Sequence, residues 1–309
     1  MRKTIWIVLL MLLLLGAKGE ITFQDYEGSV ISFDEPPKKV CVLFSSFAQM
    51  WVLSGGEVAI TVYESVERGF ASDDCVLVDS GAGKNVDLET LIYNQPDFVI
   101  GSYDVAAHLK AKSILEKAGI PTALFRVESI DDYLSVMRTL TDITGNKEAF
   151  EANAEKVYLE SKAIIEKAEK MKSEEISVLF VRSGSGYSSA KAKTSEQHFA
   201  AYMLEELGAE NIADEVPVIL DGLSFEEILM KDPDAIFISL MGDEEKSRAY
   251  MQSVINSKKW QMLTAVREGK VYFLEKDLFQ FKPNDRWAEA YTKLFEMLYA
   301  ETDLNEQTH

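Results

Sequence analysis

The chain contains few cysteine, histidine and proline residues, and it carries little positive charge for its length. Its 309 residues include 2 Cys, 3 His and 7 Pro, and 51 Asp and Glu outnumber 32 Lys and Arg, which gives a formal net charge of −19. A nucleic-acid partner needs Lys and Arg patches that displace counterions from phosphates, so we expect no nucleic-acid binding. An acidic, solvated surface accounts for most of the charge.

Signatures of catalysis and of nucleotide binding are also missing. His108, His198 and His309 stand far apart, so the sequence predicts no zinc site and no Ser–His–Asp triad, and His198 is expected on a helix surface. The stretch SGAGKN has Val78 where a Walker A loop needs its first glycine, and Asn85 where it needs Ser or Thr. GSGYSS lacks the third glycine of a dinucleotide fingerprint. We therefore expect a binding protein rather than an enzyme, with no cofactor and no metal site.

The one long apolar run stands at the beginning of the sequence. Arg2 and Lys3 precede the apolar residues 5–15, and small residues follow up to Gly19. This pattern predicts a signal peptide over residues 1–19, and the alternative is an uncleaved anchor. Because no cysteine follows the run, we expect an exported protein without a lipid anchor, in the periplasm or at the extracellular face of the cytoplasmic membrane.

Two cysteines, Cys41 and Cys75, make up the whole thiol content. In an exported chain they could form one disulfide. Both lie in apolar, strand-like runs, so two buried unpaired thiols are an equal alternative.

Short apolar runs alternate with helix-like segments along the rest of the chain. KVCVLFS, VAITVYE, CVLVDS, DFVIGS and TALFRVE form a first series, and ISVLFVRSG, DAIFISLMG and KVYFLEK belong to a second. Such runs are typical of strands covered by helices on both faces, and the alternation predicts mostly parallel sheets. In VAAHLKAKSILEKAGI, Leu109, Ile114, Leu115 and Ala118 are expected to face the core before Gly119 ends the helix.

Residues 146–175 separate the two series. They contain no Pro or Gly, and charged residues alternate with apolar ones at helical spacing, which predicts one long, partly exposed helix rather than a flexible linker. We therefore expect two Rossmann-like α/β lobes, at residues 20–145 and 176–309, joined by a rigid helix, with a ligand cleft between them.

One stretch of the first half is repeated in the second half. LETLIYNQPDFVIGS at 88–102 matches FEEILMKDPDAIFIS at 225–239 without a gap, so that Glu226 stands 137 residues after Glu89. Each copy predicts an N-capped short helix followed by a strand, with Asp87 as the first cap. An acid in the first turn favours the helix dipole. The matched placement also makes these two acids candidate contacts for a two-fold symmetric partner.

Several of these elements together resemble the class III substrate-binding proteins of ABC importers, which carry ferric siderophores, haem and cobalamin. The resemblance is carried by the repeat, by WQMLTAVREGKVYFL and by KPNDRWAEAY, and it runs from about Lys38 to Tyr299. It implies two α/β lobes bridged by one long helix. It also implies that an acid on each lobe docks onto arginines of a dimeric permease, and here those acids are Glu89 and Glu226. Gram-positive members are usually lipoproteins, and this chain lacks the required cysteine.

Ligands of parallel α/β sheets bind beyond the carboxyl ends of the strands. The residues expected there are aromatic or cationic with one methionine, namely Phe47, Tyr63, Tyr103, Arg126, Arg182, Tyr187, Met241, Phe279, Phe281 and Lys282. Rings supply contact area and cations pair with oxyanions, so this set suits a bulky anionic chelate. Each aromatic residue can instead belong to the core. Arg182 is the strongest candidate, because a cation directly after an apolar strand is costly to bury without a partner.

We therefore expect an exported, monomeric receptor that captures an iron chelate, either a ferric siderophore or haem, and delivers it to an ABC permease. The alternative ligand is cobalamin. A two-lobed cofactor-binding or chelatase-like enzyme would instead need an acid–base pair with shifted pKa values in the cleft. A surface binder without a permease is a further alternative. Because the connecting helix is stiff, closure of the lobes is expected to be small.

Overall fold

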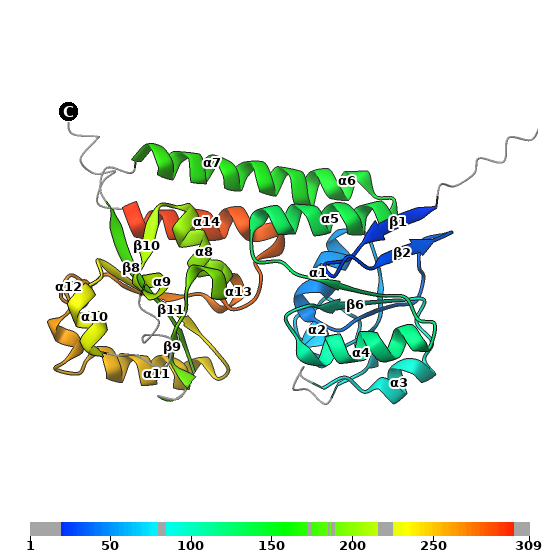
Figure 1. Cartoon of the computed structure of the whole chain (residues 1–309), viewed down its shortest axis with the longest axis horizontal. Helices are drawn as coiled ribbons and strands as arrows, with labels where there is room; N and C mark the ends of the chain where they lie inside the picture. The colour runs from blue at the N-terminus through cyan, green and yellow to red at the C-terminus, as the bar shows by residue number, and fades with distance from the viewer. Residues whose placement is uncertain are drawn as a thin grey trace, which may run out of the picture.

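Two α/β lobes lie side by side below one long helix that runs across both of them (Figure 1). The structure is a computed structural model that describes residues 20–79, 85–171, 175–184, 186, 189–215 and 225–299. The predicted signal peptide at residues 1–19 lies outside the described residues. The prediction of two α/β lobes with mostly parallel sheets is confirmed.

The first lobe contains a parallel sheet with the strand order β5-β4-β3-β6-β7. Because the chain winds outward from β3 in both directions, the strand order reverses between β3 and β6, and a doubly wound sheet opens for a ligand at such a switch point. The elements are β1 (Ile21–Gln24), β2 (Val30–Phe33), β3 (Val40–Val42), α1 (Ser45–Leu53), β4 (Val58–Thr61), α2 (Tyr63–Glu67), β5 (Val76–Leu77), α3 (Leu88–Tyr93), β6 (Phe98–Ser102), α4 (Ala106–Lys117), β7 (Thr122–Phe125) and α5 (Ile130–Thr144).

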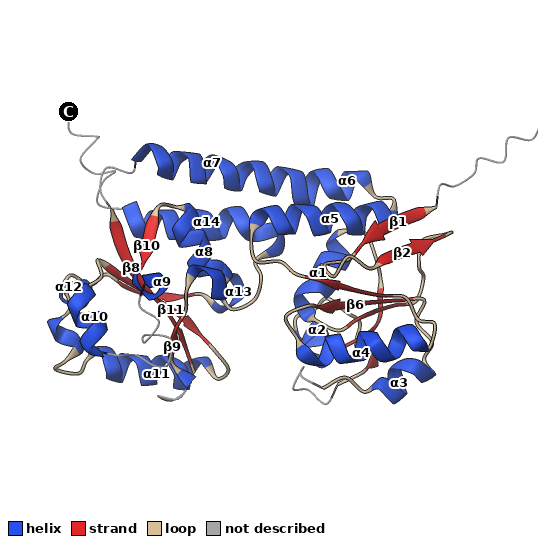
Figure 2. Cartoon of the chain, in the orientation of Figure 1, coloured by secondary structure: helices blue, strands red, loops and turns tan. Residues whose placement is uncertain are grey.

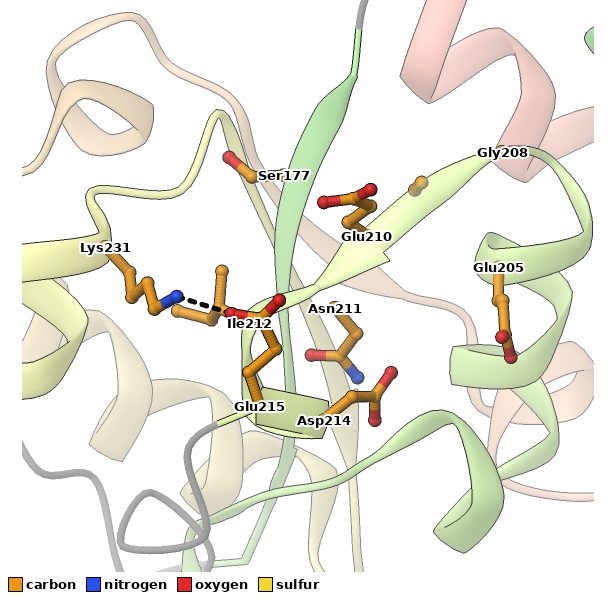
Figure 3. A pocket seen from close by; sticks show the side chains of 10 residues that line it. Ser177, Glu205, Gly208, Glu210, Asn211, Ile212, Asp214, Glu215 and Lys231 are labelled. Atoms are coloured by element: carbon orange, nitrogen blue, oxygen red, sulfur yellow. Dashed lines mark hydrogen bonds and ion pairs between the residues drawn. The ribbon is translucent and has the colours of Figure 1, made fainter.

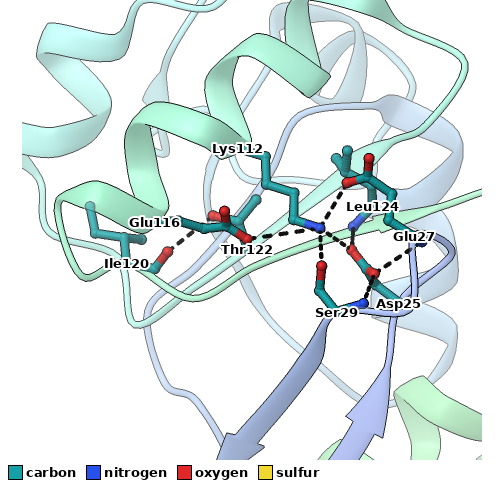
Figure 4. Close-up of polar contacts among 8 residues, drawn as sticks. All are labelled: Asp25, Glu27, Ser29, Lys112, Glu116, Ile120, Thr122 and Leu124. Atoms are coloured by element: carbon teal, nitrogen blue, oxygen red, sulfur yellow. Dashed lines mark hydrogen bonds and ion pairs between the residues drawn. The ribbon is translucent and has the colours of Figure 1, made fainter.

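The antiparallel hairpin of β1 and β2, which the sequence did not predict, is tied to α4 by a buried ion network (Figure 4). The Lys112 ammonium lies 2.6 Å from Asp25 Oδ2, 2.9 Å from Glu27 Oε2 and 2.8 Å from Ser29 Oγ. The Asp25 side chain is fully buried and also accepts the backbone N–H of Leu124 in β7 at 3.0 Å. The turn of the hairpin is therefore fixed to both α4 and β7.

The buried face of α4 differs from the expected one. It consists of His108, Ala111, Lys112 and Leu115, whereas Ile114 is 43% exposed. Two of these buried residues are polar, and each has a specific partner: Lys112 pairs with Asp25, and His108 Nδ1 accepts the backbone N–H of Ser102 at 3.0 Å. The Lys112 ammonium is thus paired in the core, whereas the buried Nε2 of His108 has no hydrogen-bond partner among the described residues.

The second lobe contains the parallel strand order β10-β8-β11-β12, and β9 pairs antiparallel with β8. Its switch point lies between β8 and β11. The elements are β8 (Ile176–Ser183), β9 (Lys191–Ala192), α8 (Phe199–Glu206), β10 (Ala209–Asn211), α9 (Ile212–Glu215), α10 (Phe225–Lys231), β11 (Ala235–Leu240), α11 (Glu244–Ile255), α12 (Thr264–Arg267), β12 (Val271–Leu274) and α13 (Lys276–Phe279).

The long helix above the lobes starts after the N-cap Asn146. It consists of α6 (Lys147–Phe150), a π-helical turn (Glu151–Glu155) and α7 (Lys156–Met171). Figure 2 shows α5 and the C-terminal helix α14 (Trp287–Tyr299) in a row directly below it. One hydrophobic core cluster contains buried side chains of α5, the π-helical turn, α7 and α14 and of both sheets. The helix is therefore packed along its length, and this packing is what makes the connection stiff.

The repeated stretch has the same backbone in both lobes. α3 and α10 begin at residues 88 and 225, and β6 and β11 begin at residues 98 and 235, so that both pairs keep the offset of the sequence repeat. Gln95 and Asp232, which precede the two prolines, both have positive φ, 47° and 39°. Asp97 and Asp234 each accept a backbone N–H near the start of the central strand of their lobe, at 2.6 Å and 2.8 Å. The two halves therefore contain one and the same helix-to-strand unit.

The predicted N-cap of the first unit is confirmed. Asp87 accepts the backbone N–H of Thr90 at 3.0 Å, and its hydrogen bonds to Thr90 lower the pKa of its carboxyl. The equivalent residue of the second unit, Ser224, lies outside the described residues.

Candidate ligand site between the lobes

A cavity of about 130 Å³ lies at the switch point of the first sheet. It is bounded by the segments that follow β3, β6 and β7, and by one residue of the second lobe, as doubly wound folds predict. The lining residues are Phe44, Ser46, Phe47, Met50, Ser102, Asp104, Val105, Val127, Glu128 and Lys282.

Lys282 is the lining residue that the second lobe supplies. Its ammonium lies 2.8 Å from Glu128 Oε1 of the first lobe and 4.5 Å from the centre of the Phe199 ring. Burial lowers the pKa of Lys282, although the Glu128 carboxylate acts in the opposite direction. The predicted residue Lys282 therefore closes the cavity from the second lobe through an ion pair across the two lobes.

The segment around Lys282 docks onto the first lobe through further contacts. The buried Asn284 amide donates to the Ser46 carbonyl at 3.0 Å and to Gln49 Oε1 at 2.9 Å. The Arg68 guanidinium of the first lobe lies 3.9 Å from the centre of the Phe281 ring. Since Phe281 and Asn284 flank Lys282 in the chain, their contacts hold the segment that carries Lys282 against the first lobe.

The rim of the first lobe contains an aromatic pair and an ion pair. Arg126 Nε donates to Asp104 Oδ1 at 3.0 Å, and the Tyr103 ring lies 4.5 Å from the Tyr26 ring, centre to centre. Arg126 lies 6.0 Å from the centre of the Tyr26 ring. The structure thus brings Tyr103 and Arg126 together beside the cavity residue Asp104, and it adds Tyr26. No local sequence pattern marks Tyr26, because its hairpin turn is positioned by Lys112, a residue far along the chain.

The second lobe presents a group of cations at the end of β8. Arg182 is exposed and pairs in register with Lys191 of β9, and Lys193 follows on the same strand–loop segment. Burial and the positive charges of Arg182 and Lys191 lower the pKa of Lys193. Within the described part of the chain, no carboxylate lies within 4.0 Å of these three cations. The group, defined as Arg182, Lys191 and Lys193, is called the cationic wall.

His198 lies behind the cationic wall, and the expectation that it sits on a helix surface is wrong. It caps α8, with Nδ1 accepting the backbone N–H of Ala200 at 3.2 Å, and its ring is 8% exposed between Phe180 and Phe199. Burial lowers the pKa of His198 well below its usual value, and the charges of Lys282, Arg182 and Lys193 act in the same direction. His198 therefore lies within reach of the charges of Lys282 and of two residues of the wall, Arg182 and Lys193.

The two buried histidines predict acid sensitivity. Burial lowers the pKa of His108 to about 4, and both rings accept a backbone N–H through Nδ1, which a protonated ring cannot do. In the unfolded chain each histidine takes up a proton near pH 6.5, whereas in the folded protein it stays neutral to lower pH. The free energy of unfolding is therefore expected to fall from pH 6.5 towards pH 4, by about 1.4 kcal/mol per pH unit for each histidine. Urea unfolding at pH 7.5, 6 and 5 measures this slope.

His198→Asn is the matched control for that measurement. Its amide oxygen keeps the N-cap acceptor and does not titrate, so the slope between pH 6.5 and pH 5 is expected to drop by about half. An unchanged slope in this variant would show that His198 contributes nothing to the acid response.

The other predicted ligand residues lie in different surroundings. Phe47 is 4% exposed and belongs to the core, although it also lines the cavity. Phe279 is 1% exposed and is a core residue. Tyr63 is 49% exposed at the start of α2 and Met241 is half-buried after β11, and neither lines the cavity. Tyr187 lies outside the described residues.

A larger cavity, of about 360 Å³, lies elsewhere on the second lobe (Figure 3). Its wall includes Ser177 at the beginning of β8, the strand β10, and the Lys231–Glu215 ion pair of 2.6 Å. The cavity lies at the edge strand β10 and the beginning of β8, away from the switch point between β8 and β11, so it is not the candidate site.

Three further observations bear on the sequence predictions. Cys41 and Cys75 are both free, and burial raises the pKa of the Cys41 thiol. In the described ranges, no three His, Cys, Asp or Glu side chains come together as a possible metal site. The described helices include none with the length and apolar character needed to span a membrane.

Comparison with known proteins identifies the family. Residues 40–278 match the sequence model of the family described as Periplasmic binding protein. The chain belongs to this family. Members of this extracytoplasmic family include the substrate-binding proteins of ABC transporters, so the resemblance to the class III proteins is confirmed. A comparison with curated protein sequences finds no match.

Solved structures of periplasmic binding proteins share the fold. The catecholate-siderophore binding protein VctP from Vibrio cholerae is 18% identical, with a TM-score of 0.71 over 90% of this chain and 99% of that chain. The siderophore-binding protein BauB, solved with acinetobactin and ferric iron, is 16% identical, with a TM-score of 0.73 over 90% and 99%. The heme-binding protein RhuT from Roseiflexus sp. RS-1 is 17% identical, with a TM-score of 0.68 over 85% and 98%.

Proposed function

We propose that this protein captures an anionic iron chelate, a ferric siderophore or haem, between its two lobes and delivers it to an ABC permease. It acts as an exported monomer, and it performs no covalent chemistry. The fold supports the binding role, because related structures named for siderophore or heme binding share it.

The observation that carries the ligand class is the cationic wall. The chain has a net charge of −19, yet Arg182, Lys191 and Lys193 gather around the carboxyl end of β8 with no carboxylate among the described residues to pair with. Cations held close together repel one another, so an anionic ligand stabilises this arrangement. The aromatic residues Tyr26 and Tyr103 on the rim of the first lobe would supply apolar contact area for the same ligand.

Titration against a panel of chelates tests the ligand class. Mature protein, residues 20–309, is mixed with a ferric catecholate siderophore, a ferric carboxylate siderophore, haemin or cobalamin, and the fluorescence of Trp51, Trp260 and Trp287 is followed. We expect saturable quenching with a ferric chelate or haemin, and an absorption spectrum of the bound chelate that stays constant with time. Binding of cobalamin alone, binding of none of the four, or conversion of a chelate would each contradict the proposal.

We also propose that Glu89 and Glu226 dock onto the permease. Both side chains are exposed, and in the described part of the chain neither forms an ion pair. They stand at equivalent positions of the repeated unit, which fits a dimeric partner with cations at two equivalent places.

The double variant Glu89→Arg with Glu226→Arg tests docking. Like charges across an interface cost several kcal/mol, so uptake of the radiolabelled ferric chelate by cells is expected to fall at least about 100-fold, while the affinity of the purified protein for that chelate stays the same. Glu166→Arg with Glu169→Arg, at two exposed positions of α7, is the control, because it changes the net charge equally. Unchanged uptake by the double variant would exclude docking through these acids and leave ligand binding intact.

A further inference from the structure

The two most exposed large hydrophobic side chains of the described residues are Tyr93, 86% exposed, and Met230, 76% exposed. They stand at equivalent positions of the repeated unit, because Met230 follows Tyr93 at the same offset that relates the two docking acids. Each lies four residues after its acid, in α3 and in α10. Side chains four residues apart share one face of a helix, so each lobe presents an acid and an apolar side chain together.

The two helices present this face in the same orientation relative to their lobes. Leu91 in α3 and Ile228 in α10, which are also equivalent in the repeat, are both fully buried. Since the buried sides of the helices correspond, the exposed sides correspond as well. Figure 1 places α3 and α10 in different lobes, both well below α7.

Single exposed hydrophobic residues are common on protein surfaces and need no explanation of their own. The next most exposed ones are Val30, at 63%, and Leu159, at 61%, and neither belongs to the repeated unit. Tyr93 and Met230 differ from these residues in three ways. They are the most exposed, they stand at equivalent positions of the internal repeat, and each lies on the same helix face as an exposed acid. Tyrosine and methionine are also among the residues enriched in protein interfaces.

We propose that Tyr93 and Met230 are the apolar anchors of the interface with the permease, a membrane partner that presents a cation beside an apolar depression at two equivalent places. This rests on the proposed docking through Glu89 and Glu226. The exposed acids steer the encounter, and their contribution falls with salt. The apolar side chains lose water on contact and determine how long the complex lasts. Met230 adapts to a depression of less regular shape than the one that receives the Tyr93 ring, because its side chain is flexible.

Photo-crosslinking in the source cells tests the partner. Benzoylphenylalanine is placed at position 93, 230 or 159 of the full chain, and the adducts are mapped by mass spectrometry. We expect positions 93 and 230 to react with the same segment of one membrane-embedded polypeptide, because a two-fold symmetric partner offers that segment twice. Position 159, on α7, gives no such adduct. The proposal would be overturned if positions 93 and 230 gave no adduct, or gave adducts with a second copy of this chain or with two unrelated proteins. It would also be overturned if position 159 gave the same adduct as positions 93 and 230.

Uptake measurements separate this proposal from the docking of the acids. Tyr93→Ser with Met230→Ser is expected to lower uptake of the ferric chelate at least about tenfold and to shorten the lifetime of the complex, with unchanged chelate affinity in the purified protein. Leu159→Ser is the control for removing an exposed apolar side chain. Normal uptake by the double serine variant, together with loss of uptake on charge reversal at Glu89 and Glu226, would overturn the apolar anchors alone. Normal uptake by both would overturn the docking proposal as well.

Discussion

Arg182→Glu combined with Lys193→Glu is expected to weaken binding of the ferric chelate at least about 100-fold. A hydrogen bond to a charged group contributes about 1.5–3 kcal/mol, and the variant loses two such donors and adds repulsion of the anion. Arg182 is exposed and Lys193 is half-buried, and neither pairs with a carboxylate of the described chain, so the fold is expected to tolerate the change. The measurement is the fluorescence titration, repeated at two salt concentrations.

Lys110→Glu with Lys117→Glu is the matched control, because it changes the net charge equally at two exposed positions of α4. If the loss arose only from long-range repulsion, both double variants would lose similar affinity, and added salt would restore it. If Arg182→Glu with Lys193→Glu kept an affinity within about threefold of the parent protein, the cationic wall would be excluded from ligand binding.

Lys112→Met is expected to lower the free energy of unfolding by about 3–5 kcal/mol, the range found when one partner of a buried ion pair is removed. The Lys112 side chain is 5% exposed and the Asp25 side chain is fully buried, so the variant leaves a carboxylate in the interior without its cation. Urea unfolding at pH 7 measures the loss. Lys110→Met, on the exposed side of the same helix, serves as the control and is expected to change stability by less than about 0.5 kcal/mol.

A second substitution shows whether the loss comes from the unpaired charge. Lys112→Met combined with Asp25→Asn removes both charges, and we expect it to recover part of the stability lost in Lys112→Met. If Asp25→Asn lowered the free energy of unfolding of Lys112→Met as much as it lowers that of the parent protein, the two residues would act independently. The ion network would then not be the cause of the stability loss.

The sheets and the long helix could be predicted because their signals are local. β6 and β11 are apolar runs buried along their whole length, and the 147–171 helix has no residue that would break it. The repeat could also be seen in the sequence, because its two copies align without a gap. In both copies a proline marks the end of the helix, and Gln95 and Asp232 precede these prolines. These features depend on neighbours in the chain.

The parts that could not be predicted depend on distant residues. Lysine is usually a surface residue. Lys112 is buried because it forms an ion pair with Asp25, which belongs to a hairpin with weak strand signals. Tyr26 joins the rim through the same network. Lys191 joins the cationic wall because the two-residue strand β9 pairs with the end of β8, opposite Arg182. No pattern within a window of the sequence records such pairings.

The π-helical turn Glu151–Glu155 lies in the long helix that crosses from lobe to lobe. An α-helix turns by about 100° per residue, so the deletion of a single residue there would swing α7 and everything packed on it around the helix axis by about that angle. The span between Glu89 and Glu226 is thus set by the twist of a segment that touches neither acid. In a homologue with a different turn, the two acids would be spaced differently, and the matching cations of the importer would have to be spaced differently as well. Receptor and importer would therefore have to change together.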